Sequence, residues 1–114
     1  MDELGRLLDG LATSLSAVEF DPRTIADATR LVLQYLNRPE DNTHENCTRV
    51  DLFVMQVLED ATLNWRVENL PTDLALIIQD MGMCLHDAHS NPVIAENFQS
   101  TPQQLLARLT ECQL

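Results

Sequence analysis

The side chains best suited to chemistry in this sequence are its three histidines and three cysteines. His86 and His89 are three residues apart, so on a helix they share one face and could bind the same metal ion. His44 and Cys47 have the same spacing, so four ligands could converge if the two segments lie side by side. No spacing matches a zinc finger or an HExxH motif, and the simpler interpretation places both later histidines at a solvated helix C-terminus. We expect no cofactor and keep a metal site at His44, Cys47, His86 and His89 as an alternative.

Catalytic arrangements are not evident in the sequence. Cys84 lies close to His86 along the chain, but on a helix the two side chains point about 200° apart, which prevents a nucleophile–base hydrogen bond. The chain also has no Glu-x-x-His motif of di-metal carboxylate proteins, no glycine-rich phosphate loop and no Gly-x-Ser-x-Gly elbow. An enzymatic function is therefore not expected.

Charge is the most unusual property of the composition. Eighteen carboxylates face seven basic residues, all of them arginine, which gives a formal net charge of −11. This charge repels nucleic-acid phosphates and anionic membranes, whereas it attracts a basic protein partner. Solubility alone is the plainer explanation of such an acidic surface. If the charge has a function, we expect it to be the binding of a basic protein.

Acidic residues concentrate between positions 40 and 60, and Trp65-Arg66 follows shortly after. Aromatic and arginine side chains beside carboxylates are typical of interface hot spots, although Trp65 could equally close the core. We therefore expect a partner-binding surface of an inhibitor, immunity-type or adaptor protein. Its candidate residues are Glu40, Asp41, Glu45, Asp51, Glu59, Asp60, Trp65 and Arg66.

Targeting segments, membrane spans and cysteine content indicate where in the cell a protein resides. No segment resembles a signal peptide or reaches the ~18 apolar residues of a membrane span. Three cysteines without a CxxC pair do not suggest a disulfide framework. These features predict a cytoplasmic protein, and the acidic charge predicts that it contacts neither membrane nor nucleic acid.

Prolines preceded by capping residues mark the helices that must position these side chains. Asp21-Pro22, Asn91-Pro92 and Thr101-Pro102 each combine an N-cap with a proline at the first helical position, and Pro71 marks another start. Apolar side chains recur at helical spacing after each start and near the N-terminus. The predicted helices cover about residues 2–18, 22–37, 71–89, 91–98 and 101–112, and a third helix begins between Asn42 and Thr48 and runs to Leu58, with 61–70 left open.

We therefore predict an all-α fold: a compact bundle of four main helices plus one or two short ones, forming a single domain over residues 1–114. The third helix is apolar on most sides, which favours a central position, although Phe53-Val54 and Val57 would tolerate a strand. Its apolar surface could also make a homodimer interface, a further alternative. Gly82 within a good helix suggests close packing against a neighbour.

Overall fold

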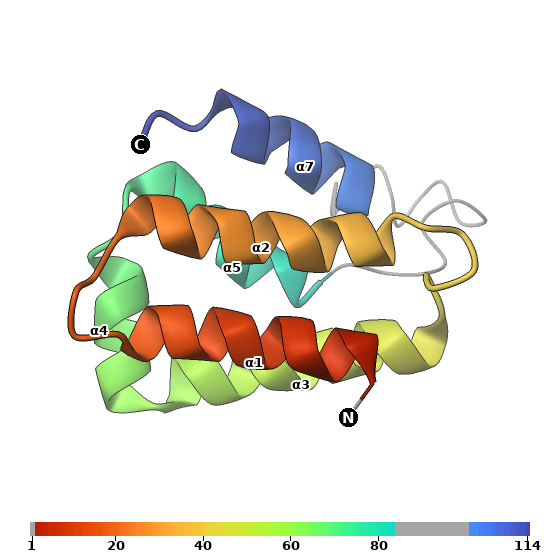
Figure 1. Cartoon of the computed structure of the whole chain (residues 1–114), viewed down its shortest axis with the longest axis horizontal. Helices are drawn as coiled ribbons and strands as arrows, with labels where there is room; N and C mark the ends of the chain where they lie inside the picture. Colours follow the sequence, from red (N-terminus) through yellow and green to blue (C-terminus); the bar gives the residue numbers. More distant parts are fainter. Residues whose placement is uncertain (1, 84–100) are drawn as a thin grey trace.

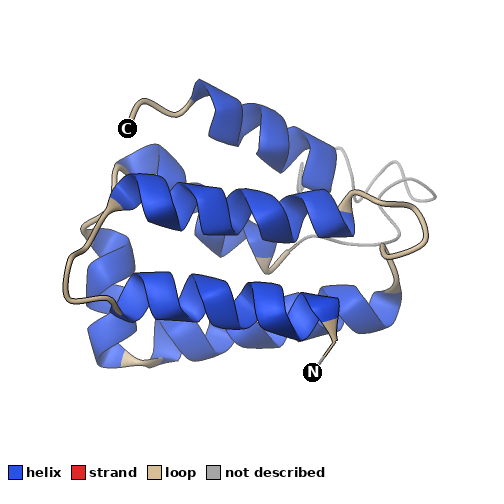
Figure 2. Cartoon of the chain, viewed as in Figure 1, coloured by secondary structure: helices blue, strands red, loops and turns tan. Residues whose placement is uncertain are grey.

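The protein is described by a computed structural model in which residues 2–83 and 101–114 are placed. These residues form six helices and no strand, so the all-α fold class is confirmed (Figure 2). The segment around Phe53-Val54 is helical, which rules out the local β structure that its composition would have tolerated. The short helix predicted over 91–98, and residues 84–89 of the one before it, lie outside the described residues. The helices are α1 (Glu3–Ser16), α2 (Pro22–Leu36), α3 (His44–Glu59), α4 (Ala61–Glu68), α5 (Thr72–Met81) and α7 (Pro102–Glu111).

Capping side chains begin most of these helices, as the sequence predicts. The Asp21 carboxylate accepts a hydrogen bond from the backbone N–H of Arg23 at 3.0 Å and starts α2. At the start of α7, the Thr101 hydroxyl accepts from the Gln104 N–H, and the Gln104 side chain accepts from the Thr101 N–H, a complete capping box. Asp60 ends α3 and caps α4, so residues 61–68 form a separate helix rather than a continuation.

The helices form two layers around a shared interior. Helices α1 and α2 lie antiparallel side by side, and α3 runs in the same direction as α1 (Figure 1). Helix α4 closes one end of the molecule and leads into α5, while α7 packs against α2 and α5. All six contribute to one hydrophobic core. On α1 the buried side chains are Leu4, Leu8, Leu11 and Leu15.

Two predictions about packing are wrong. The apolar stripe predicted for a helix over about residues 2–18 includes Val18, but α1 ends at Ser16 and the Val18 side chain is 97% exposed in the loop that follows. The third helix is not central, because α3 packs on α4 and α5 and only lightly on α1. Its buried residues are Cys47, Val50, Val54 and Val57, whereas Leu52 and Met55 are exposed.

Gly82 has the close-packing role that the sequence suggests, but at a helix end. The predicted helix over 71–89 ends earlier, because α5 stops at Met81 and Gly82 is its C-cap. A Cβ at Gly82 would lie 3.1 Å from Val54 Cβ and 3.2 Å from Val54 Cγ1. Val54 is buried and β-branched, so it has little freedom to move aside. Glycine here allows the end of α5 to approach α3.

Candidate functional site

The four candidate metal ligands are only partly covered by the structure. His44 and Cys47 lie in the first turn of α3, where His44 is exposed and Cys47 is buried. The Cys47 thiol lies 3.7 Å from the Asn42 side-chain oxygen. His86 and His89 lie outside the described residues. Within residues 2–83 and 101–114, no three histidine, cysteine or acidic side chains come close enough to hold a metal ion. The four-ligand site stays a prediction.

The acidic residues predicted as a partner-binding cluster separate into groups with different surroundings. Glu40 and Asp41 lie in the loop between α2 and α3, where both form ion pairs with Arg38 at the end of α2. Arg38 also pairs with Glu3 of α1 at 3.7 Å. We call this group of residues, Glu3, Tyr35, Arg38, Glu40 and Asp41, the arginine end. One guanidinium therefore faces three carboxylates.

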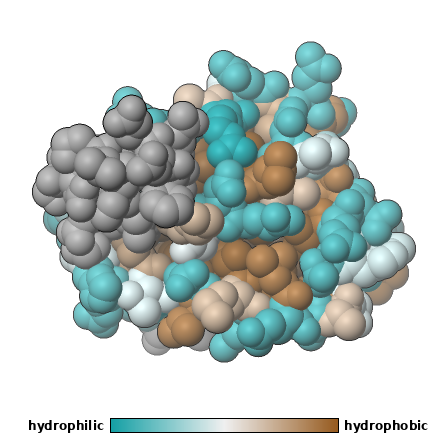
Figure 3. Space-filling model, turned by 180° about the vertical axis from the view of Figure 1, so that it is seen from behind, coloured by the Kyte–Doolittle hydropathy of each residue, from teal (hydrophilic) through white to brown (hydrophobic). Residues whose placement is uncertain are grey.

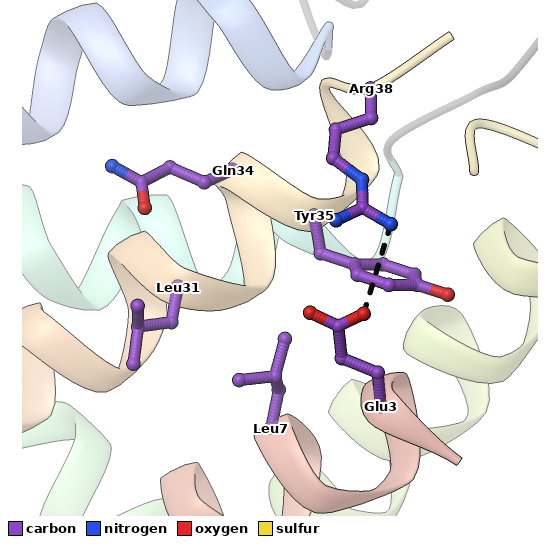
Figure 4. Close-up of a pocket in the computed structure, with 6 residues that line it drawn as sticks. All are labelled: Glu3, Leu7, Leu31, Gln34, Tyr35 and Arg38. Carbon is purple, nitrogen blue, oxygen red and sulfur yellow. Dashed lines mark ion pairs between the residues drawn. The ribbon is translucent and has the colours of Figure 1, made fainter. Parts of the chain in front are cut away.

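The aromatic ring of Tyr35 completes the arginine end. The Arg38 guanidinium carbon lies 4.8 Å from the centre of the Tyr35 ring, a cation–π arrangement (Figure 4). The carboxylates around Arg38, Asp41 foremost, raise the pKa of its guanidinium. Partial burial and the neighbouring Asp41 carboxylate raise the pKa of the Tyr35 hydroxyl. A pocket of about 280 Å³ opens beside this group between α1 and α2, with Leu7 and Leu31 on its walls (Figure 4).

The remaining acidic candidates lie on or next to α3. Glu45 and Glu59 are exposed at the two ends of this helix, and neither forms an ion pair within the described part of the chain. Asp51 is half-buried, and its carboxylate lies close to Gly82. The Asp60 carboxylate accepts hydrogen bonds from the backbone N–H groups of Thr62 and Leu63, so its first role is to cap α4.

Arg66 and Trp65 are neighbours in α4 with opposite environments. The Arg66 guanidinium donates hydrogen bonds to the carbonyl oxygens of Leu15 at 3.0 Å and of Ala17 at 2.6 Å. It also lies 5.6 Å from the centre of the Phe20 ring. Arg66 therefore caps the C-terminal end of α1 and ties α4 to it. These bonds place the start of the α1–α2 loop beside α4, at one end of the molecule (Figure 1).

Trp65 does not close the core, because 64% of its surface is exposed. Glu68 lies three residues further on, on the same side of α4, and Glu59 precedes this helix by two residues. Neither carboxylate forms an ion pair among residues 2–83 and 101–114. We call this part of the molecule, the end of α3 and α4 with Glu59, Trp65, Arg66 and Glu68, the tryptophan corner. It combines an exposed aromatic ring with uncompensated negative charge.

One important contact was not anticipated from the sequence. Asp2 caps α1 by accepting from the Gly5 N–H, and it also accepts two hydrogen bonds from the Arg49 guanidinium, at 2.6 and 2.8 Å. The Arg49 bonds and the Gly5 N–H hold the pKa of the Asp2 carboxyl far below its usual range. The two residues are 47 positions apart, so no local pattern could reveal the pair. This contact joins the first turn of α1 to α3.

An open groove runs between α1 and α3 beyond that contact. Its volume is about 410 Å³. Apolar side chains of both helices line it, and Leu52 is 52% exposed there. Light contact between α1 and α3 leaves this space unfilled. The lining residues are Gly5, Leu8 and Asp9 of α1 and Arg49, Leu52, Phe53 and Gln56 of α3.

Further apolar side chains are exposed on the helices behind α1 and α2. Met55 of α3 and Leu76 of α5 are each more than two-fifths exposed. Viewed from behind, the described part of the molecule shows apolar surface in its middle with hydrophilic residues around it (Figure 3). Contiguous apolar surface with a polar rim is typical of protein-binding sites.

None of the described helices is both long enough and apolar enough to cross a lipid bilayer. Comparisons of the chain with protein-family models, with curated proteins and with solved structures find no match. The candidate site therefore consists of features of the chain itself: an exposed aromatic side chain, an open groove and carboxylates that form no ion pair with residues 2–83 or 101–114.

Proposed function

We propose that this protein is a small protein-interaction domain that binds a basic surface of another protein, as an inhibitor or adaptor does. The observation that carries the proposal is the exposure of Trp65, the chain's single tryptophan, on a helix that Arg66 fixes in place. Large aromatic side chains dominate the free energy of binding at many interfaces, because they bury much apolar area with little loss of conformational entropy. A cytoplasmic location stays a prediction from the sequence.

The charge of the tryptophan corner favours a basic partner. Glu59 and Glu68 have no counterion among the described residues, and the cation of Arg66 is directed at backbone carbonyl oxygens rather than at a carboxylate. Lysine or arginine side chains of a partner could therefore supply the missing counterions around a buried aromatic contact. The net charge of −11 would accelerate the encounter with such a partner.

The test combines partner identification with a matched pair of variants. Partners would be isolated by affinity capture and purified, and their binding measured by calorimetry at low salt and at about 0.5 M salt, where exposed charges are largely screened. Trp65→Ala should weaken binding by about 30-fold, equivalent to roughly 2 kcal/mol at a hot spot. Leu31→Ala is the control: it truncates a half-exposed apolar side chain elsewhere, on α2, and should change the affinity little.

The proposal also predicts that the affinity falls steeply with salt. Acidic partners, salt-insensitive binding, or equal effects of the two variants would each overturn it. Thermal melting of both variants serves as the folding control, since neither side chain belongs to the buried core.

A further inference from the structure

We propose that the groove between α1 and α3 binds a basic amphipathic helix of the partner protein. This inference rests on the proposed function and specifies the shape and chemistry of what is bound. The groove has an apolar floor, made by Leu8, Leu52 and Phe53. A helix that lays one apolar face into a groove is a common mode of peptide recognition.

The dimensions of the groove suit a short helix. Helix α1 has 14 residues and α3 has 16, and they run in the same direction (Figure 1). The groove itself is lined by residues 5–9 of α1 and 49–56 of α3, which at 1.5 Å per residue cover about 6 and 11 Å. Glu45 and Glu59 of α3 lie beyond this lined part and are about 21 Å apart along the helix, a distance that a partner helix of about 15 residues can span. Gly5 lies in the wall of α1 and has no side chain, so a helix backbone can approach closely there.

The charges around the groove favour a positively charged occupant. On α3, Glu45 and Glu59 share a helical stripe with Leu52 and lie about one turn beyond the two ends of the lined part, and Asp9 lies on the opposite wall. None of these three carboxylates forms an ion pair within the described residues. The one cation in the lining, Arg49, is held by Asp2 and is therefore already compensated. The groove thus combines apolar contact area with unpaired negative charge.

A second copy of this chain fits the groove less well than a basic helix. Each copy has a formal charge of −11, so two acidic surfaces would repel each other. A basic helix places its apolar face on Leu52 and Phe53 and its lysine or arginine side chains near the carboxylates. Self-association is therefore one outcome of the test that would overturn the proposal.

The probe is a synthetic peptide of leucine and lysine of about 15 residues, long enough as a helix to reach from Glu45 to Glu59, with leucines at helical spacing so that they form one face. Its binding to the full chain would be measured by calorimetry and by amide chemical-shift changes. Two control peptides have the same length: one has the same composition in an order that spreads leucine around the helix, and one replaces lysine by glutamate. We expect measurable binding of the first peptide only, with shifts at Gly5, Asp9 and Gln56.

Matched variants then test the position of the site. Leu52→Ala should weaken binding of the peptide by about fivefold or more, since it removes half-exposed apolar contact area. Leu31→Ala on α2, which truncates a similarly exposed leucine, should change the affinity less than twofold. Asp9→Asn should weaken binding more than Glu111→Gln on α7, although both remove one negative charge. Circular dichroism of each variant verifies that the helices persist.

Several results would overturn the proposal that the groove binds a basic helix. They are the absence of binding, equal binding of the scrambled lysine peptide, equal effects of Leu52→Ala and Leu31→Ala, and a dimer in sedimentation that the peptide does not disrupt. These results are separable from failure of the proposed function. A partner that loses affinity with Trp65→Ala but not with Leu52→Ala would support binding at the tryptophan corner and contradict a helix in the groove.

Discussion

At the arginine end, Glu3, Glu40 and Asp41 surround the guanidinium of Arg38, whereas at the tryptophan corner Glu59 and Glu68 have no ion-pair partner among the described residues. The two regions lie near opposite ends of the molecule (Figure 1). Both contain an arginine beside an aromatic ring, but Arg38 faces carboxylates and Arg66 faces backbone carbonyl oxygens. The position of each arginine, rather than the number of carboxylates, determines which surface is left with unpaired charge.

The largest effect is expected from Arg66→Ala. This change removes two hydrogen bonds from a charged donor and leaves the carbonyl oxygens at the end of α1 without that partner. The free energy of unfolding should fall by about 2–3 kcal/mol, measured by urea denaturation. Arg30→Ala is the matched control, because among the described residues Arg30 pairs with the exposed Asp27 alone and should contribute about 0.5 kcal/mol or less. Equal losses in the two variants would show that Arg66 does not fix the tryptophan corner.

Local features of the fold were predictable from the sequence because their causes are local. A capping side chain beside a proline determines a helix start within a few residues, and the capping box at Thr101 has the geometry that its sequence predicts. The same holds for the buried stripes of α1 and α5, which follow from helical spacing of apolar residues.

The candidate site was less predictable because its contacts join distant segments. Arg66 bonds to a carbonyl 51 positions away, and Asp2 bonds to Arg49 across 47 positions. The acidic cluster also appears continuous along the chain, but α3 has 16 residues and separates its two ends by about 24 Å. Sequence proximity therefore placed Glu40 and Glu59 together, whereas the helix between them assigns each to a different end.

A smaller effect, visible as pH dependence, is expected from Asp2→Asn. Asparagine can still cap α1, so the change removes mainly the charged pair with Arg49. The folded-state pKa of Asp2 lies below its unfolded value, so the stabilisation is present above about pH 5 and is lost as the pH falls through the folded-state pKa. The wild-type protein should be the more stable at pH 7, and the difference should shrink toward pH 2. Urea denaturation across this range measures it, and a difference that is constant with pH would contradict the assignment.

The smallest effect is expected from Arg38→Ala, which should make the arginine end resemble the tryptophan corner. The change removes the Arg38 guanidinium, which is the shared counterion of Glu3, Glu40 and Asp41. A short lysine peptide should then bind about two- to threefold more tightly at low salt, and the gain should vanish at high salt. Calorimetry with tetralysine measures the change.

The control for Arg38→Ala is Arg30→Ala, which alters the net charge equally but frees only the single carboxylate of Asp27. A larger gain with Arg38→Ala would show that the grouping of carboxylates around one cation determines the binding of basic ligands. Identical gains would show that net charge alone governs it, and the distinction between the two ends would then have no consequence for binding. Arg30 lies in the middle of α2 and Arg38 lies two residues after its end, so the comparison varies the surroundings of the cation within one short stretch of the chain.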